Sequence, residues 1–101
     1  MNFKYAYIWA ASQANIIVSV DKNIFNNNNS KTQIANCIRS TELFKNKKDN
    51  HKKCSIIFFC QDNDIVGAID GTDEEQLKII QNLINKNSLN IPSEHWFSHT
   101  L

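Results

Sequence analysis

Large aromatic side chains alternate with smaller or charged ones at the start of the chain, which is the spacing of a β-strand. One face of this strand is entirely aromatic, because four residues recur at every second position: Phe3, Tyr5, Tyr7 and Trp9. The run Ile16–Val20 is rich in β-branched residues and suits a returning strand. The pattern therefore predicts a β-hairpin over residues 3–20.

Residues 21–29 are rich in asparagine and predict a loop, since asparagine satisfies its own backbone and tolerates positive φ. Ser30 and Gln33 then have the spacing of a capping box. Apolar residues follow at helical intervals, so we expect a helix over residues 30–44. The polar, lysine-rich residues 45–53 predict a further loop.

The second half of the chain gives the same order of strands and helix. The run after Cys54 is apolar on both faces, as in a central strand, and a polar turn separates it from a second apolar run. We therefore expect a hairpin over residues 54–70. Acidic residues suited to a helix N-terminus then predict a helix over residues 72–87. An aromatic tail, residues 92–101, begins at the single proline.

The resulting order, ββαββα, predicts a single α+β domain over residues 1–101. We expect a small antiparallel sheet of about four strands with both helices on one face. The other face and the edges of such a sheet would be uncovered, and a homodimer would cover them.

Composition indicates which classes of partner and which cellular compartment to expect. The net charge is +1, so no strong global field draws the chain to nucleic acid or to acidic membranes. No stretch approaches the roughly 18 consecutive apolar residues of a membrane span. Three cysteines are an odd number, which favours free thiols in a reducing cytoplasm over a secreted disulfide scaffold.

The motifs of common chemistries do not occur in the chain. Two glycines are too few for the glycine-rich loops that hold dinucleotides and triphosphates. The histidines and cysteines match no zinc-finger spacing. Cys54 follows several basic residues, which would lower the pKa of its thiol if it were exposed, but the start of a strand explains its position equally well. We expect no catalytic residue, metal or cofactor, and hence a protein that is not an enzyme.

Charged residues gather in two places. Five lysines in residues 45–53 could contact phosphate groups, although a solvated loop explains them as well: Lys45, Lys47, Lys48, Lys52 and Lys53. Six of the ten acidic residues lie between positions 62 and 75, and Asp62 and Asp64 occupy the turn of the second hairpin. Such a charge dipole suits docking to a complementary protein.

The aromatic residues are the strongest candidates for a partner-binding surface. The aromatic face of the first strand either packs beneath the helices or faces solvent, and the sequence leaves both alternatives open. If it faces solvent, Tyr5, Tyr7 and Trp9 would act with Trp96 and Phe97 as anchors for a protein partner.

The motif Tyr5-Ala6-Tyr7-Ile8 resembles the first strand motif of GIY-YIG nuclease domains. Ile16–Val20 lies about where the second motif of that family belongs, and Glu74 falls near the position of its metal-binding glutamate. The second motif departs from the family, however, with isoleucine and serine in place of its tyrosine and glycine, and the only arginine lies far from the expected position. The resemblance implies a catalytically dead copy, and it requires residues 65–70 to be a helix.

These observations together predict a small, cytoplasmic, non-catalytic module that binds another protein. A phage-encoded inhibitor of host defence and an immunity protein that neutralises a toxin both fit this description. The alternative hypothesis is a nucleic-acid-binding protein that uses the lysines of residues 45–53, on a GIY-YIG-like domain or on another fold.

Overall fold

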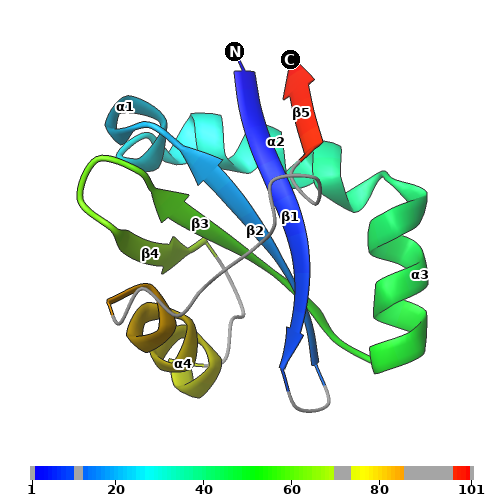
Figure 1. The fold of residues 1–101 in the computed structure, drawn as a ribbon. Coiled ribbons are helices and arrows are strands. Elements are labelled where there is room, and N and C mark those ends of the chain that lie inside the picture. The colour runs from blue at the N-terminus through cyan, green and yellow to red at the C-terminus, as the bar shows by residue number, and fades with distance from the viewer. Residues whose placement is uncertain (1, 11–12, 70–73, 86–96, 101) are drawn as a thin grey trace.

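A five-stranded mixed sheet lies at the centre of the fold in the computed structural model (Figure 1). The structure describes residues 2–10, 13–69, 74–85 and 97–100. The fold is α+β, with the element order ββαααββαβ. The elements are β1 (Asn2–Ala10), β2 (Gln13–Val20), α1 (Lys22–Phe25), α2 (Asn28–Arg39), α3 (Glu42–His51), β3 (Cys54–Cys60), β4 (Ile65–Ala68), α4 (Glu74–Asn85) and β5 (Phe97–Thr100).

The strands are ordered β4-β3-β2-β1-β5 across the sheet. Both predicted hairpins are confirmed, because β1 pairs with β2 and β3 pairs with β4, each in antiparallel orientation. The hairpins meet through a parallel pairing of β2 and β3, with Ile17 opposite Ile57. A parallel pair needs a long crossover, and the three helices between β2 and β3 provide it. The prediction of an entirely antiparallel sheet is therefore wrong, and the sheet has five strands where about four were expected.

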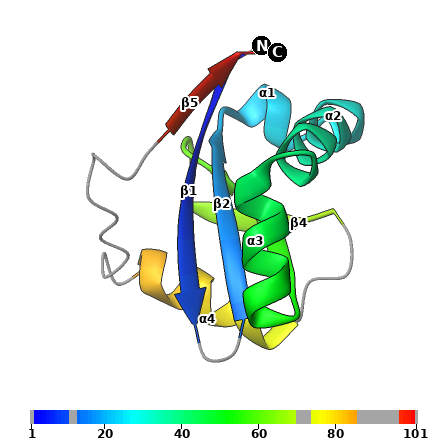
Figure 2. The same ribbon diagram turned by 90° about the vertical axis from the view of Figure 1, so that its right-hand side faces the viewer.

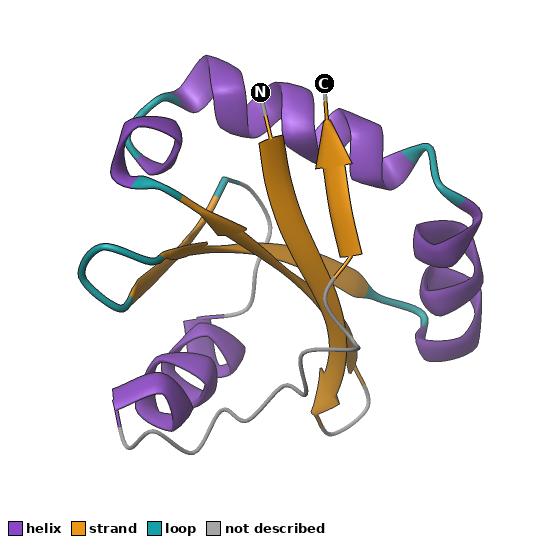
Figure 3. Cartoon of the chain, turned by 45° about the horizontal axis from the view of Figure 1, so that its top comes forward, coloured by secondary structure: helices purple, strands orange, loops and turns teal. Residues whose placement is uncertain are grey.

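Helices cover both faces of the sheet, so the prediction that they share one face is also wrong. Figure 3 shows the sheet between α2 on one side and α4 on the other. The physical reason lies in the central strands: all residues from Ala14 to Val20 in β2 are buried. A strand that is apolar on both faces must be covered on both faces.

Each face has its own hydrophobic core. The core beneath α2 is larger and packs Ile34 and Ile38 against Val18 and Phe58 of the sheet. The core beneath α4 packs Ile80 and Ile84 against Ile17 and Ile57. On the α2 side, the buried Lys31 places its Nζ 5.1 Å from the ring centroid of Phe25 and 5.9 Å from that of Phe58, which stabilises its charge.

The helix predicted over residues 30–44 is wrong, because the chain forms two helices there. The N-cap of α2 is Asn27, whose Oδ1 accepts a hydrogen bond of 3.1 Å from the Ser30 amide, so the capping box predicted at Ser30 is also wrong. After α2 ends, Thr41 caps α3 by accepting a bond of 3.2 Å from the Phe44 amide. The lysine-rich segment is therefore mostly helix, up to His51, and not a loop.

Two further short elements lie in segments predicted to be irregular. The helix α1 occupies the asparagine-rich segment, with Asp21 as its N-cap, and its Phe25 packs over β4 at Gly67. A Cβ at Gly67 would lie 3.1 Å from the Phe25 ring, so the glycine permits this close approach. In the aromatic tail, residues 97–100 form β5 beside β1, and the two ends of the chain therefore lie side by side (Figures 1 and 2).

The remaining boundaries follow the predictions closely. The fourth helix is confirmed within residues 72–87, although positions 72, 73, 86 and 87 lie outside the described residues. Residues 92–96 of the tail also lie outside them. The segment Ile65–Ala68 is strand β4, so the helix that the GIY-YIG resemblance requires at residues 65–70 is not found over these four positions.

Candidate functional site

β1 and β5 together build an aromatic strip on the α2 side of the sheet. The antiparallel register places Phe3 opposite His99 and Tyr5 opposite Phe97. The ring centroids lie 5.3 Å apart in the first pair and 5.5 Å apart in the second, and Phe3 lies 6.2 Å from Tyr5. The strip consists of five residues: Phe3, Tyr5, Tyr7, Phe97 and His99.

The strip runs from the core to the surface. Phe3 is buried, Tyr5 and Tyr7 are half-buried, and Phe97 keeps 50% of its surface exposed. The two alternatives left open by the sequence are thus both partly realised. Phe3 on β1 packs into the core, whereas Phe97 on β5 faces solvent. Trp9 lies on β1, but its side chain is outside the described part of the structure, as is Trp96.

Helix α3 covers the Tyr7 end of the strip. The Tyr7 hydroxyl and His51 Nε2 share a hydrogen bond of 3.2 Å, and Lys47 Nζ lies 4.2 Å from the centroid of the Tyr7 ring. Burial raises the pKa of Tyr7, and the charge that Cys54 gains on ionising raises it further. Tyr7 is therefore a neutral phenol at physiological pH, and it joins α3 to β1.

Helix α2 contacts the other end of the strip through a thiol and an imidazole. Cys37 Sγ lies 3.4 Å from His99 Nε2, which is within hydrogen-bond distance for sulfur. This contact ties the edge strand β5 to α2. Sequence analysis missed it, because 62 positions separate the two residues and each sits in a segment with no polar motif.

A basic hollow lies next to the strip, between α3 and the start of β3. Phe44 and Lys48, one helical turn apart, face it, whereas Lys47 and His51 face the aromatic strip. The hollow has a volume of about 330 Å³. Its lining residues are Arg39, Phe44, Lys48, Lys52, Lys53, Cys54, Ser55 and Ile56. Three of the five predicted phosphate-contacting lysines therefore converge on one site, and Arg39 joins them.

The Cys54 thiol in this hollow is not the activated nucleophile that its basic neighbours suggested. Burial raises the pKa of Cys54 to about 11, and the nearby charges of Lys47 and Lys48 lower it only in part. The exposure on which a lowered pKa depended is absent, since Cys54 is half-buried. The thiol is therefore protonated and uncharged at physiological pH.

Alkylation kinetics test this protonation state. At pH 8 we expect iodoacetamide to modify Cys54 of the folded protein roughly a hundredfold more slowly than Cys54 of the chain unfolded in guanidinium, because only the thiolate reacts. Mass spectrometry of the Cys54 peptide gives both rates, and equal alkylation rates in the folded and unfolded chain would contradict the assignment.

The same pKa shift predicts a pH dependence of stability. Because folding raises the pKa of Cys54 from 9.0 to about 11, the free energy of unfolding should fall as the pH rises between those values.

The acidic turn lies at the far end of β3 from the basic hollow. Asp62 Oδ2 accepts a hydrogen bond of 2.7 Å from the Lys22 amide at the start of α1, and Asp64 adopts a left-handed conformation with a φ of 54°. Seven residues of β3 separate the two charged regions, which corresponds to roughly 20 Å. Asp62 therefore has a structural role, while both carboxylates remain exposed at one pole of the molecule.

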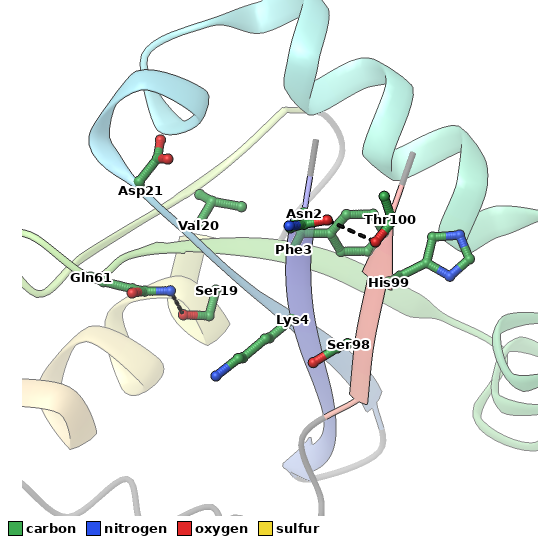
Figure 4. Close-up of a pocket in the computed structure, with 10 residues that line it drawn as sticks. All are labelled: Asn2, Phe3, Lys4, Ser19, Val20, Asp21, Gln61, Ser98, His99 and Thr100. Atoms are coloured by element: carbon green, nitrogen blue, oxygen red, sulfur yellow. Dashed lines mark hydrogen bonds between the residues drawn. The ribbon is translucent and has the colours of Figure 1, made fainter.

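A second, polar hollow of about 460 Å³ opens at the end of the sheet where the two chain termini lie (Figure 4). Gln61 Nε2 donates to Ser19 Oγ at 2.7 Å, and Thr100 Oγ1 donates to Asn2 Oδ1 at 2.7 Å. These bonds tie the end of β3 to β2 and tie β5 to β1. Much of the polar lining thus serves the sheet itself.

Two classes of site find no support in the part of the chain that the structure describes. No group of three or more histidine, cysteine, aspartate or glutamate side chains there could hold a metal ion. No helix among the same residues is long and apolar enough to cross a membrane. Comparison with known proteins found no matching family model, curated protein or solved structure. The geometry of the aromatic strip and of the basic hollow is therefore the basis for assigning a function.

Proposed function

We propose that this protein is a non-catalytic module that binds another protein through the aromatic strip and the β5 edge. One observation carries the proposal: Phe97, half exposed and packed against the Tyr5 ring, lies on β5, an edge strand of the sheet. Large aromatic side chains at the centre of an interface supply much of its binding energy. An edge strand adds main-chain hydrogen-bonding groups next to them.

The arrangement supports an extended segment of the partner as the bound element. Among the described residues, β5 pairs only with β1, and all four of its residues are exposed. A partner strand added along β5 would continue the sheet by β-augmentation, with an apolar side chain against Phe97. Lys47, over the Tyr7 ring at the same strip, would favour an acidic side chain in the partner.

A binding module of this kind acts by covering a surface of its target. We propose that it does so as an inhibitor, either one that a phage directs at host defence or an immunity protein that neutralises a toxin. We also propose that it acts in the cytoplasm, which is supported by its three free cysteines.

Truncation of Phe97 tests the interface. Phe97→Ala should weaken binding to the partner by about 2 kcal/mol or more, which is roughly 30-fold in Kd, because an aromatic anchor is lost. Ile65→Ala is a matched control, since Ile65 is also an exposed apolar residue, at 40%, but lies on the opposite edge strand, β4. Proteins captured from the native host would first be purified, and each Kd would then be measured by calorimetry with the two purified components.

The outcome is decided by the contrast between the two variants. A partner lost by Phe97→Ala and kept by Ile65→Ala, with slowed hydrogen exchange of the β5 amides on binding, would support the proposal. A partner that binds both variants as tightly as the wild type would overturn it.

The protein bound at the β5 edge could also be a second copy of this chain. In that case light scattering should give twice the monomer mass for the wild type and 11.6 kDa for Phe97→Ala.

A further inference from the structure

We propose that the basic hollow is a binding site for the phosphate group of a nucleotide, either free or within a single strand of nucleic acid. The hollow shares no lining residue with the protein-binding strip, although Lys47 lies between them, over the Tyr7 ring and close enough to Cys54 to lower the pKa of its thiol. Four cationic side chains line the hollow: Arg39, Lys48, Lys52 and Lys53. No acidic residue is among its lining residues.

The remaining lining residues carry no negative charge. Cys54 is uncharged at physiological pH, as described above, and Phe44, Ser55 and Ile56 carry no charge. The guanidinium of Arg39 donates from Nη1 to Asn36 Oδ1 at 3.2 Å, which orients it through a neutral amide. Concave sites lined by one sign of charge, with apolar walls, concentrate counter-ions from solution.

Helix dipoles alone do not account for this clustering. Lysine and arginine near a helix C-terminus offset its partial negative charge, and both α2 and α3 end beside the hollow. Each terminus contributes roughly half a negative charge, so the two together are equivalent to about one negative charge, which is fewer than the three lysines that line the hollow. The excess of positive charge suits a phosphate group with one or two negative charges.

The end of α3 places one of these cations in the hollow. Lys52 is the C-cap of α3 and adopts a left-handed conformation with a φ of 63°, which ends the helix. The chain then enters β3 through Lys53, and both lysines line the hollow.

The size of the hollow limits the ligand. A volume of about 330 Å³ is at the lower end of the range for small-molecule sites, so one nucleotide unit fits and a larger ligand must extend outside. The Phe44 ring and Ile56 form the apolar part of the wall. Phosphate is the expected charged group because lysine and arginine bind it through several charge-assisted hydrogen bonds at once.

The test uses two phosphate probes, 5′-AMP and a fluorescent twelve-residue oligothymidylate. The variant Lys48→Gln/Lys52→Gln removes two cations from the hollow, and Lys22→Gln/Lys78→Gln removes two exposed cations elsewhere, on α1 and α4. We expect the hollow variant to weaken binding of the bound probe by roughly tenfold or more and the control by less than threefold. Thermal melting would verify that both variants are folded.

Salt dependence identifies the source of the phosphate. Three or four contacts to a single strand predict a loss of roughly 20- to 50-fold in oligonucleotide affinity between 50 and 200 mM salt. Oligonucleotide binding tenfold tighter than 5′-AMP binding would assign the site to a nucleic acid strand, and comparable affinities would assign it to a free nucleotide.

Failure of both probes to bind at millimolar concentration, or equal weakening by both double variants, would overturn the proposal. Phe97→Ala should leave phosphate binding unchanged, so this result is independent of the protein-binding function.

Discussion

Replacement of Phe58 by alanine is expected to lower the free energy of unfolding by about 3–5 kcal/mol. Phe58 is fully buried at the centre of β3, where it pairs with Val18 on one side and Gly67 on the other. Its ring also faces Lys31, so truncation would remove apolar contacts and a cation–π interaction from a buried charge. A domain of this size has a total stability of roughly 5–15 kcal/mol, so the loss would be a large part of it.

Phe59 provides the matched control on the same strand. It points to the opposite face, toward the α4 core, and is only half-buried. Urea denaturation should therefore show a smaller fall in the unfolding midpoint for Phe59→Ala than for Phe58→Ala, with similar slopes. The reverse order would contradict the assignment of the larger core to the α2 side.

The strands could be predicted from the sequence because local patterns determine them. The alternation of Phe3, Tyr5 and Tyr7 and the apolar run before Cys60 both coincide with strands of the structure. The parallel joining of the hairpins was not predictable in this way, since a run such as Ile16–Val18 that is apolar on both faces is compatible with either orientation. The same pattern does, however, imply that helices cover both faces of the sheet, and it would therefore have placed α4 on the face opposite α2.

Helix α3 shows where a periodicity argument fails. Beyond Phe44 the segment has no apolar stripe, so its lysines were interpreted as a loop. The structure stabilises it instead through the Thr41 cap and through the packing of Lys47 over Tyr7. The cap could have been identified from the sequence, because Thr41 precedes Glu42 in the order expected at a helix start. The contact with Tyr7 could not, since it depends on tertiary structure.

In the candidate sites too, single residues could be identified from the sequence, whereas their grouping depends on tertiary structure. Tyr5, Tyr7 and Phe97 were each named from the sequence, but their grouping in space required β5, a four-residue strand too short to give a clear signal. The hollow required Arg39 to approach three lysines, which the break between α2 and α3 makes possible. Helix α3 thus contributes to both proposed sites, with Lys47 and His51 at the strip and Phe44 and Lys48 at the hollow.

Replacement of Asn15 by valine is expected to raise the free energy of unfolding by about 1–2 kcal/mol. Asn15 lies in the middle of the sheet, with Ile8 and Ser55 beside it on the neighbouring strands, and it is fully buried. Within the part of the chain that the structure describes, neither its Nδ2 nor its Oδ1 has a hydrogen-bond partner. Folding therefore removes an amide from water without compensation, and a β-branched apolar residue would avoid that cost while suiting a strand.

Ser19 is the matched control, because it lies on the same strand and the same face of the sheet but has a partner. Its Oγ accepts a hydrogen bond of 2.7 Å from Gln61, so Ser19→Val should lower the free energy of unfolding by about 0.5–1.5 kcal/mol. Opposite shifts of the urea midpoint in the two variants would show that pairing, and not polarity alone, decides the energetics of this face. If Asn15→Val also lowered the midpoint, its amide would have to be hydrogen-bonded in solution, and the prediction would be wrong.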